Sequence, residues 1–372
     1  MTYLDNAATS YPKPACVYKK LFWCLKNAGG NPGRSAHRPA LRAAEEIYEA
    51  REAIAKLLDF SYPERIVFTQ NATHALNLAI RAFGPHHTIY SDREHNSVIR
   101  PIEALTAHGC GHGVFDTDGD ILASMEAAVT EETDLCVLSL CSNVTGECFP
   151  LEALREFRKR HPSVHVILDG SQWIGHLPFS LSKELCDVLC APGHKALFGI
   201  QGSGFAAFTE EGEYEPLTYG GSGNESASKK MPALLPERLE AGTLATPAIA
   251  TLGVGAKCLL REGMESVSEK LKMLTEQMHE RLRAIPKLRP IGENGFAIAS
   301  FTMENAPPSA IAEFLDTRGI CVRAGLHCAP LIHEKNRTAA EGTVRVSLSY
   351  LNKTRDLDRL YRALLEFTKL YN

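Results

Sequence analysis

Short apolar runs rich in β-branched residues alternate along this chain with longer segments in which apolar residues recur every three or four positions. The strand-like runs are 65–69, 87–90, 135–140, 164–168 and 187–190. The segments with helical spacing and helix-forming composition are 39–58, 73–83 and 150–160. Such alternation predicts a mostly parallel β-sheet covered by helices.

The pattern changes after residues 219–236, a stretch rich in Gly, Ser and Pro that we interpret as a long loop. Beyond it, the helical segments are 248–260, 264–285 and 354–371, and the strand-like segments are 296–303, 319–325 and 343–351. A chain of 372 residues is long for one hydrophobic core. We therefore predict an α/β protein with a large domain, 15–245, and a smaller α+β domain formed by 246–372 together with the N-terminal segment 1–14.

Composition removes several classes of function. Net charge is −4, without a block of like charges, which argues against a nucleic-acid surface. No apolar window is long enough to span a bilayer, and the N-terminus MTYLDNAATSYPKP lacks the basic head and apolar core of a signal peptide. We expect a cytoplasmic protein, whose eleven cysteines are reduced thiols and not a disulfide framework.

Two strand ends carry the side chains that point most clearly to chemistry. VHVILDGSQW places Asp169 and Gln172 after one apolar run, and CDVLCAPGHK places His194 and Lys195 after another. The carboxyl ends of neighbouring parallel strands face one crevice, so these side chains are expected to meet there. A carboxylate for a pyridinium nitrogen and a lysine for a Schiff base are what pyridoxal phosphate requires. The alternative is a helix-capping Asp and a surface Lys.

Three weaker signals lie in the same half of the chain. IVFTQNATHALNL runs from a strand through a polar turn into a helix, and the helix start at Ala72 and Thr73 suits a phosphate, although an ordinary N-cap gives the same pattern. His95 could lie against an aromatic ring or be a surface histidine. Asn143 could donate to a carboxylate or simply form a turn.

A thiol near the C-terminus adds a nucleophile. Cys328 lies in VRAGLHCAP, on a loop flanked by Gly and Pro, with Arg323 and His327 nearby. Cationic neighbours lower the pKa of a thiol and favour the reactive thiolate. Most other cysteines, such as Cys136 and Cys190, lie in apolar runs and are expected to be small core residues.

Metal and nucleotide sites are not supported. Two groups of residues have metal-like spacing, namely Cys186, Cys190 and His194, and His108, Cys110 and His112. Neither matches a standard zinc spacing. The sequence contains no Walker A motif, and GIQGSG has its glycines in the wrong order for a dinucleotide fold. We expect no bound metal.

Taken together, these motifs resemble the class V aminotransferase family, in particular its cysteine desulfurase and selenocysteine lyase branch. The similarity extends over nearly the whole chain. It is carried, in order, by YLDNAATS, GNPGRSAHR, the T-x-x-A-T-H turn at 69–74, DREHNS, SNVTGE, LDGSQ, GHK, LEAGT, RAGLHCAP and RVSLSYLN. The resemblance implies the fold of type I pyridoxal phosphate enzymes and a homodimer with active sites at the subunit interface.

The resemblance also implies a role for individual residues. Lys195 would carry the cofactor, His95 would stack on its ring, Asp169 would pair with the ring nitrogen and Gln172 would bond the ring hydroxyl. The phosphate would be held by Ala72, Thr73 and His194, with Thr243 reaching across from the partner subunit. Arg345, assisted by Asn143, would bind the substrate carboxylate bidentately. Cys328 would be the nucleophile.

One position departs from the family pattern. Where the family usually has a phosphate-binding serine, two residues before the histidine of GHK, this chain has Pro192, with neither hydroxyl nor N–H. Loss of one charge-assisted hydrogen bond costs on the order of 1.5–3 kcal/mol of cofactor affinity. We expect other donors to compensate.

The expected reaction is conversion of L-cysteine to L-alanine, with the sulfur left on Cys328 as a persulfide. Three alternatives stay open at this stage: a selenocysteine lyase, a class V aminotransferase in which Cys328 is incidental, and a non-catalytic relative that binds the cofactor. The compact loop around Cys328 resembles that of type II desulfurases, which usually pass sulfur to an acceptor protein. The GGSGNESAS loop resembles a subgroup known only as desulfurase-like.

Overall fold

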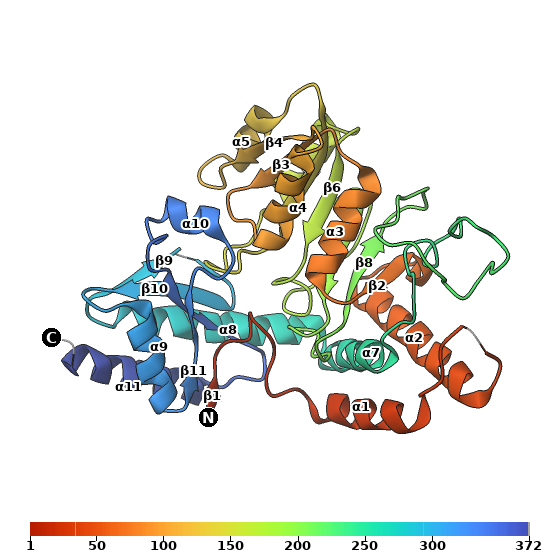
Figure 1. Cartoon of the computed structure of the whole chain (residues 1–372). Coiled ribbons are helices and arrows are strands. Elements are labelled where there is room, and N and C mark those ends of the chain that lie inside the picture. Colours follow the sequence, from red (N-terminus) through yellow and green to blue (C-terminus); the bar gives the residue numbers. More distant parts are fainter. Residues whose placement is uncertain (34, 293, 371–372) are drawn as a thin grey trace.

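The centre of the molecule is a seven-stranded sheet (Figure 1) in the order β2-β8-β7-β6-β5-β3-β4. We describe a computed structural model, which covers residues 1–33, 35–292 and 294–370. The strands are β2 (Ile66–Thr69), β3 (His87–Ser91), β4 (Gly111–Phe115), β5 (Thr133–Ser139), β6 (His165–Asp169), β7 (Val188–Pro192) and β8 (Gly204–Phe208). All neighbouring strands are parallel except β8, which is antiparallel to β2 and β7. The predicted α/β fold with a mostly parallel sheet is confirmed.

Both faces of this sheet are buried, which explains the continuous apolar runs in the sequence. Side chains alternate between the faces. Val67, Val137 and Ile167 pack with α3 (Ala72–Phe83) and α4 (Asn96–Thr106) in one hydrophobic cluster. The intervening residues of the same strands, among them Leu138 and Leu168, belong to a second cluster on the other face.

The second cluster is covered by four helices from parts of the chain that are far apart in the sequence. They are α1 (Ala15–Asn27), α2 (Arg38–Leu57), α6 (Leu151–Arg160) and α7 (Thr246–Glu262), with α5 (Ile121–Ala128) packed on α6 and β4. Helix α7 packs against α1 and α2 and approaches the segment after Lys195 closely. A Cβ atom at Gly255 would lie 1.9 Å from the carbonyl oxygen of Leu197, so only glycine permits this approach.

A four-stranded antiparallel sheet, β12-β13-β10-β9, stands beside the first (Figure 1). Its strands are β9 (Leu288–Ile291), β10 (Ile298–Met303), β12 (Arg323–Gly325) and β13 (Thr343–Ser347). The accompanying helices are α8 (Met264–Arg283), α9 (Pro308–Thr317), α10 (Pro330–Lys335) and α11 (Thr354–Leu370). The N-terminal strand β1 (Thr2–Tyr3) pairs in parallel with β11 (Ile320–Cys321), which joins the start of the chain to this unit.

The observed helices and strands differ from the predicted ones mainly in where they end and in the elements that were not predicted. The predicted strand at 343–351 ends at Ser347, and the predicted strand at 319–325 is two short strands in different sheets. Several elements were not predicted from the sequence: helices α1, α4, α5, α9 and α10, and strands β1, β4, β8 and β9. In β4, for example, polar and small residues dominate because the strand lies at the sheet edge.

The expectation that all eleven cysteines are reduced is wrong for two of them. Cys141 and Cys148 are joined by a disulfide, whereas the other nine are free. The two residues face each other across an antiparallel bridge at the base of a hairpin, with Cα atoms 4.1 Å apart. A spacing of seven residues does not reveal such a hairpin, because nothing in CSNVTGEC distinguishes it from an open loop.

Among the described residues, we find no helix that has both the length and the apolar character needed to cross a membrane.

Candidate active site

A cavity of about 200 Å³ opens where β2, β3, β5, β6 and β7 end and the second sheet begins. Most of the residues that the sequence singled out line it. The lining residues are Ala7, Ala8, Asn71, Ala72, Thr73, His95, Ser97, Ser139, Cys141, Asn143, Asp169, Ser171, Gln172, Pro192, His194, Lys195, Arg323, His327 and Arg345. The topology thus brings together side chains that are up to 338 positions apart in the chain, from Ala7 to Arg345.

Asp169 is the last residue of β6 and is 5% exposed. One of its oxygens, Oδ1, accepts a hydrogen bond from the N–H of Ser171 at 2.8 Å. Gln172 is also buried and donates through Nε2 to the carbonyl oxygen of Ala7 at 3.1 Å, while its Oε1 has no partner. The carboxylate is therefore held in place by the turn that follows the strand.

Lys195 and His194 lie in the turn after β7. Burial lowers the pKa of Lys195 to about 8, although the charge of Asp169 acts in the opposite direction. Burial, with the charges of Lys195 and Lys13, lowers the pKa of His194 to about 4. The carbonyl oxygen of His194 accepts from the N–H of Ser10 at 3.1 Å, which ties this turn to the N-terminal segment. At neutral pH about a tenth of the amine is thus unprotonated, far more than for an ordinary lysine, and the imidazole is neutral.

The start of α3 forms one wall of the cavity. Asn71 is its N-cap, and its side-chain oxygen accepts from the N–H of His74 at 2.9 Å. Ala72 and Thr73, the first two helical residues, line the cavity, and Thr73 Oγ1 lies 2.8 Å from Ser97 Oγ. A helix N-terminus with a nearby hydroxyl is suited to a phosphate group.

His95 caps α4 and is fixed in one orientation. Its Nδ1 accepts from the backbone N–H of Ser97 at 3.0 Å. Burial lowers its pKa to about 4, partly countered by Asp169. The ring is therefore neutral at pH 7, and the bond to Nδ1 places its proton on Nε2.

Arg345 provides a buried cation. It is 1% exposed, and its Nη2 is paired with Asp5 Oδ1 at 2.9 Å while its Nη1 donates to the carbonyl oxygen of Asn143 at 3.0 Å. The amide of Asn143 donates to the carbonyl oxygen of His327 at 2.7 Å. Arg323 is the cross-strand neighbour of Arg345 on β12, and both line the cavity. Two guanidinium groups side by side favour an anionic ligand.

Two predicted site residues are not in the cavity of this chain. Cys328 is exposed and does not line it, although its neighbour His327 does. The carbonyl oxygen of Cys328 accepts from the N–H of Asn96 at 2.7 Å, so its loop is attached next to His95. Thr243 is exposed just before α7, where its hydroxyl accepts from Asn31 Nδ2 at 3.3 Å.

Pro192 ends β7, opposite Gly204 of β8, and lines the cavity without a donor.

Metal coordination finds no support in the ranges described: no group of three or more His, Cys, Asp or Glu side chains is arranged to hold an ion. Cys186 and Cys190 are buried, and burial raises the pKa of both thiols well above the ordinary value. They are core residues.

Four polar atoms of the cavity residues are buried without a hydrogen-bond partner among the described residues: Gln172 Oε1, His194 Nδ1, His327 Nδ1 and Arg345 Nε. Unsatisfied buried polar atoms are rare and costly in proteins, which suggests that a ligand pairs with them. They lie in a cavity that also contains a carboxylate, a lysine with a lowered pKa and a helix N-terminus. This set fits pyridoxal phosphate.

Sequence comparison agrees with this chemistry. The family model described as aminotransferase class-V matches residues 2–360. The chain belongs to the class-V aminotransferase family. Class-V aminotransferases depend on pyridoxal phosphate.

Individual members of the class-V family give a finer picture. A probable cysteine desulfurase of Methanothermobacter thermautotrophicus is 31% identical over 98% of this chain and 94% of its own length. A probable cysteine desulfurase of Synechocystis sp. is 30% identical, over 98% and 90%. The solved apo structure of the cysteine desulfurase from Thermococcus onnurineus NA1 has a TM-score of 0.90 at 26% identity, covering 99% of this chain and 94% of that chain. The present class-V chain therefore has the size and fold of these enzymes.

Sequence reasoning missed the residues that orient the predicted ones. Asp5 lies in YLDNAATS, a recognised motif, but its pairing with Arg345 spans 340 positions. Ser97 and Glu94 flank His95 in DREHNS. Glu94 is fully buried, accepts hydrogen bonds from the hydroxyls of Ser91 and Ser139, and has its pKa raised to about 7 by burial. No sequence signal marks Glu94 as buried, because DREHNS is polar throughout.

Proposed function

We propose that this protein is a pyridoxal-phosphate-dependent cysteine desulfurase, which converts L-cysteine to L-alanine and leaves the sulfur on Cys328 as a persulfide. The observation that carries the proposal is the cavity in which Asp169, Lys195 and Arg345 meet beside the Cys328 loop. The names of its relatives support the same reaction. In this proposal the working unit is a homodimer, in which Thr243 of each chain would approach the partner's cavity.

The cofactor would be held by groups of known position. Ala72, Thr73 and His194 would hold its phosphate, Asp169 its ring nitrogen and Gln172 its ring hydroxyl, with His95 against the ring. Bound pyridoxal phosphate supplies an electron sink for the bond that breaks at the substrate. Because Pro192 offers no donor, the unpaired Nδ1 of His194 and the amides at the start of α3 would carry the phosphate.

Substrate binding would use the two guanidinium groups. Arg345 donates one N–H of Nη1 to Asn143 and one of Nη2 to Asp5. Its unpaired Nε, the second N–H of each Nη and the neighbouring Arg323 are left for a carboxylate. Since Asp5 is fixed by the N-terminal segment, the carboxylate site is assembled only in the folded chain. Binding there would place the substrate Cα near Lys195.

Proton and sulfur transfer would then follow from the two reactive groups. Lys195 Nζ, with its pKa near 8, would take the proton from the substrate Cα. His95 would hold a proton at Nε2 beside the substrate sulfur. The thiolate of Cys328 would attack that sulfur, forming an S–S bond while the C–S bond breaks. The electron pair of the broken bond would take up a proton at the substrate Cβ, which becomes the methyl group of alanine. An acceptor thiol, on a partner protein or a small molecule, would then take the sulfur.

The test is an assay of alanine and of sulfide or selenide with L-cysteine and L-selenocysteine, comparing the wild type with Cys328→Ala. A desulfurase loses alanine formation from cysteine in the variant. If alanine formation from cysteine is undiminished, the assigned role of Cys328 is wrong. Loss with cysteine but not with selenocysteine identifies a lyase whose selenide release needs no thiol. A keto-acid product in place of alanine identifies an aminotransferase.

A further inference from the structure

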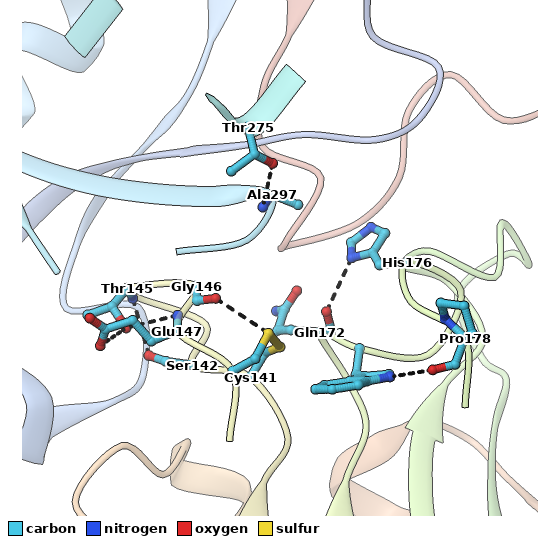
Figure 2. Close-up of a disulfide and its surroundings, with 12 residues drawn as sticks. Cys141, Ser142, Thr145, Gly146, Glu147, Gln172, His176, Pro178, Thr275 and Ala297 are labelled. Carbon is cyan, nitrogen blue, oxygen red and sulfur yellow. Dashed lines mark hydrogen bonds between the residues drawn. A yellow bond between two sulfur atoms is a disulfide. The ribbon is translucent and has the colours of Figure 1, made fainter. Parts of the chain in front are cut away.

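The hairpin between Cys141 and Cys148 connects the cavity to the second sheet. It begins two residues after β5 ends at Ser139, and Cys141 forms part of the cavity wall. Its base is the disulfide, and Figure 2 shows this bond together with the turn formed by Ser142, Thr145, Gly146 and Glu147. The backbone closes the same loop, because Ser142 N–H donates to the carbonyl oxygen of Glu147 at 3.0 Å.

The tip of the hairpin is anchored to the unit that carries Arg345. The hydroxyl of Ser300 donates to the carbonyl oxygen of Val144 at 2.6 Å, and the N–H of Phe296 donates to that of Gly146 at 2.8 Å. A Cβ atom at Gly295 would lie 1.8 Å from the carbonyl oxygen of Thr145, so the contact is very close. Because these contacts hold the tip, the tip cannot shift freely when the base of the hairpin moves.

Asn143, inside the hairpin, contacts both groups that serve the substrate. Its carbonyl oxygen holds Arg345, and its amide holds the backbone of His327, which precedes Cys328. The disulfide thus constrains the residue that orients the carboxylate-binding guanidinium. The ends of this hairpin are joined covalently by the backbone and by the disulfide, so reduction of the disulfide leaves only the backbone connection.

We propose that Cys141 and Cys148 form a reversible thiol–disulfide site in the cavity wall, and that its state sets the affinity of the cavity for the carboxylate of an α-amino acid. The oxidised pair holds Asn143 against Arg345 and binds the amino acid more tightly. The proposal rests on the proposed function only in taking an α-amino acid as the ligand of the cavity.

The reaction partner is a small dithiol. Cys141 is 3% exposed, whereas Cys148 is half-buried, so a thiolate from solvent would attack Cys148 Sγ and release the Cys141 thiolate. Lys195, Arg323 and Arg345 line the same cavity as Cys141 and favour that thiolate. The second thiolate of the reductant then attacks the reductant sulfur that is bonded to Cys148, and this releases the Cys148 thiolate. Two protein thiols and one cyclic disulfide result, and a small-molecule disulfide reverses the exchange with the same two electrons.

The test uses holoenzyme carrying Cys328→Ala, so that the exposed catalytic thiol does not react. The protein is equilibrated with oxidised or reduced dithiothreitol, and alkylation followed by mass spectrometry counts free thiols at Cys141 and Cys148. Binding of L-alanine, a ligand without a thiol, is measured in both states by absorbance titration. Hydrogen exchange of residues 142–147 is followed in the same samples, as a readout independent of the cofactor.

The expected result is protection of both thiols by oxidised dithiothreitol, faster exchange of 142–147 after reduction, and about two- to tenfold weaker alanine binding, the effect of loosening one hydrogen bond. Adding Cys141→Ser and Cys148→Ser should abolish the dependence on redox state. The matched control, Cys16→Ser with Cys258→Ser, changes a neighbouring but unbonded pair on α1 and α7 and should preserve it.

Equal alanine affinity and equal exchange in the two states would overturn the inference, as would free thiols at both positions under oxidising conditions. Failure of the proposed function has a different signature. In that case wild-type enzyme forms no alanine from cysteine, while thiol counting and hydrogen exchange still report on the hairpin.

Discussion

Substitution of Asp5 by Asn isolates the contribution of one carboxylate to substrate binding. Asp5 touches the guanidinium of Arg345 at 2.9 Å and is the partner that holds Nη2. Asn has the same shape and retains a neutral acceptor oxygen, so the change removes charge and leaves packing intact. Arg345, 1% exposed, then lacks a counter-charge.

The size of the effect follows from hydrogen-bond energetics. A bond to a charged partner contributes about 1.5–3 kcal/mol and a neutral one about 1 kcal/mol. The Asp5 side chain is 20% exposed, so solvent screens part of the difference, and about 1–2 kcal/mol should be lost. If the guanidinium becomes less ordered, KM for L-cysteine should rise about 5- to 30-fold with a smaller change in kcat.

The assay is steady-state alanine formation over a range of L-cysteine concentrations, together with L-alanine binding by absorbance titration. Asp358→Asn is the matched control, because Asp358 pairs with Arg281 at 2.7 Å on helices away from the cavity. Its KM should equal that of the wild type. An unchanged or lowered KM in Asp5→Asn would refute the view that Asp5 positions Arg345, and would mean that the carboxylate competes with the substrate instead.

Three further predictions concern Lys195, a buried ion pair outside the cavity and the disulfide. Because burial lowers the pKa of Lys195 to about 8, the rate at which apoenzyme takes up pyridoxal phosphate should rise as pH increases through about 8, not 10.5, as followed by absorbance. Glu240→Ala leaves Arg51, its partner at 2.5 Å, as an unpaired buried cation, and urea denaturation should show a loss of about 3–5 kcal/mol; a loss below 1 kcal/mol would contradict this. Changing both Cys141 and Cys148 to Ser opens a loop of about eight residues, which should lower the unfolding free energy by about 2–3 kcal/mol relative to the oxidised wild type and leave no effect of added reductant.

The sequence predicted the elements whose patterns are set by burial. Strand β6, with apolar residues on both faces, and helix α2, with clear helical spacing, were found within one or two residues of their observed ends. The edge strand β4 was not found, because its pairing depends on a neighbour and not on its own composition. The same limit applies to β8, whose direction is visible only in its pairing.

For the site, the strand ends were predictable and the supporting contacts were not. Asp169 and Lys195 follow apolar runs, so their meeting at one edge follows from parallel topology. The partners Asp5 and Ser97 have no pattern of their own, since their roles depend on contacts made only after folding. The disulfide was mispredicted for the same reason: an expectation based on cellular compartment does not report which two thiols a hairpin brings together.

Transfer of sulfur from L-cysteine to Cys328 can be measured in one turnover of holoenzyme with L-cysteine in the absence of reductant. The enzyme is then alkylated, digested and analysed by mass spectrometry. We expect one additional sulfur atom on the peptide that contains Cys328 for each alanine released. Alanine released with that peptide unmodified, or with the added sulfur on another cysteine, would contradict it.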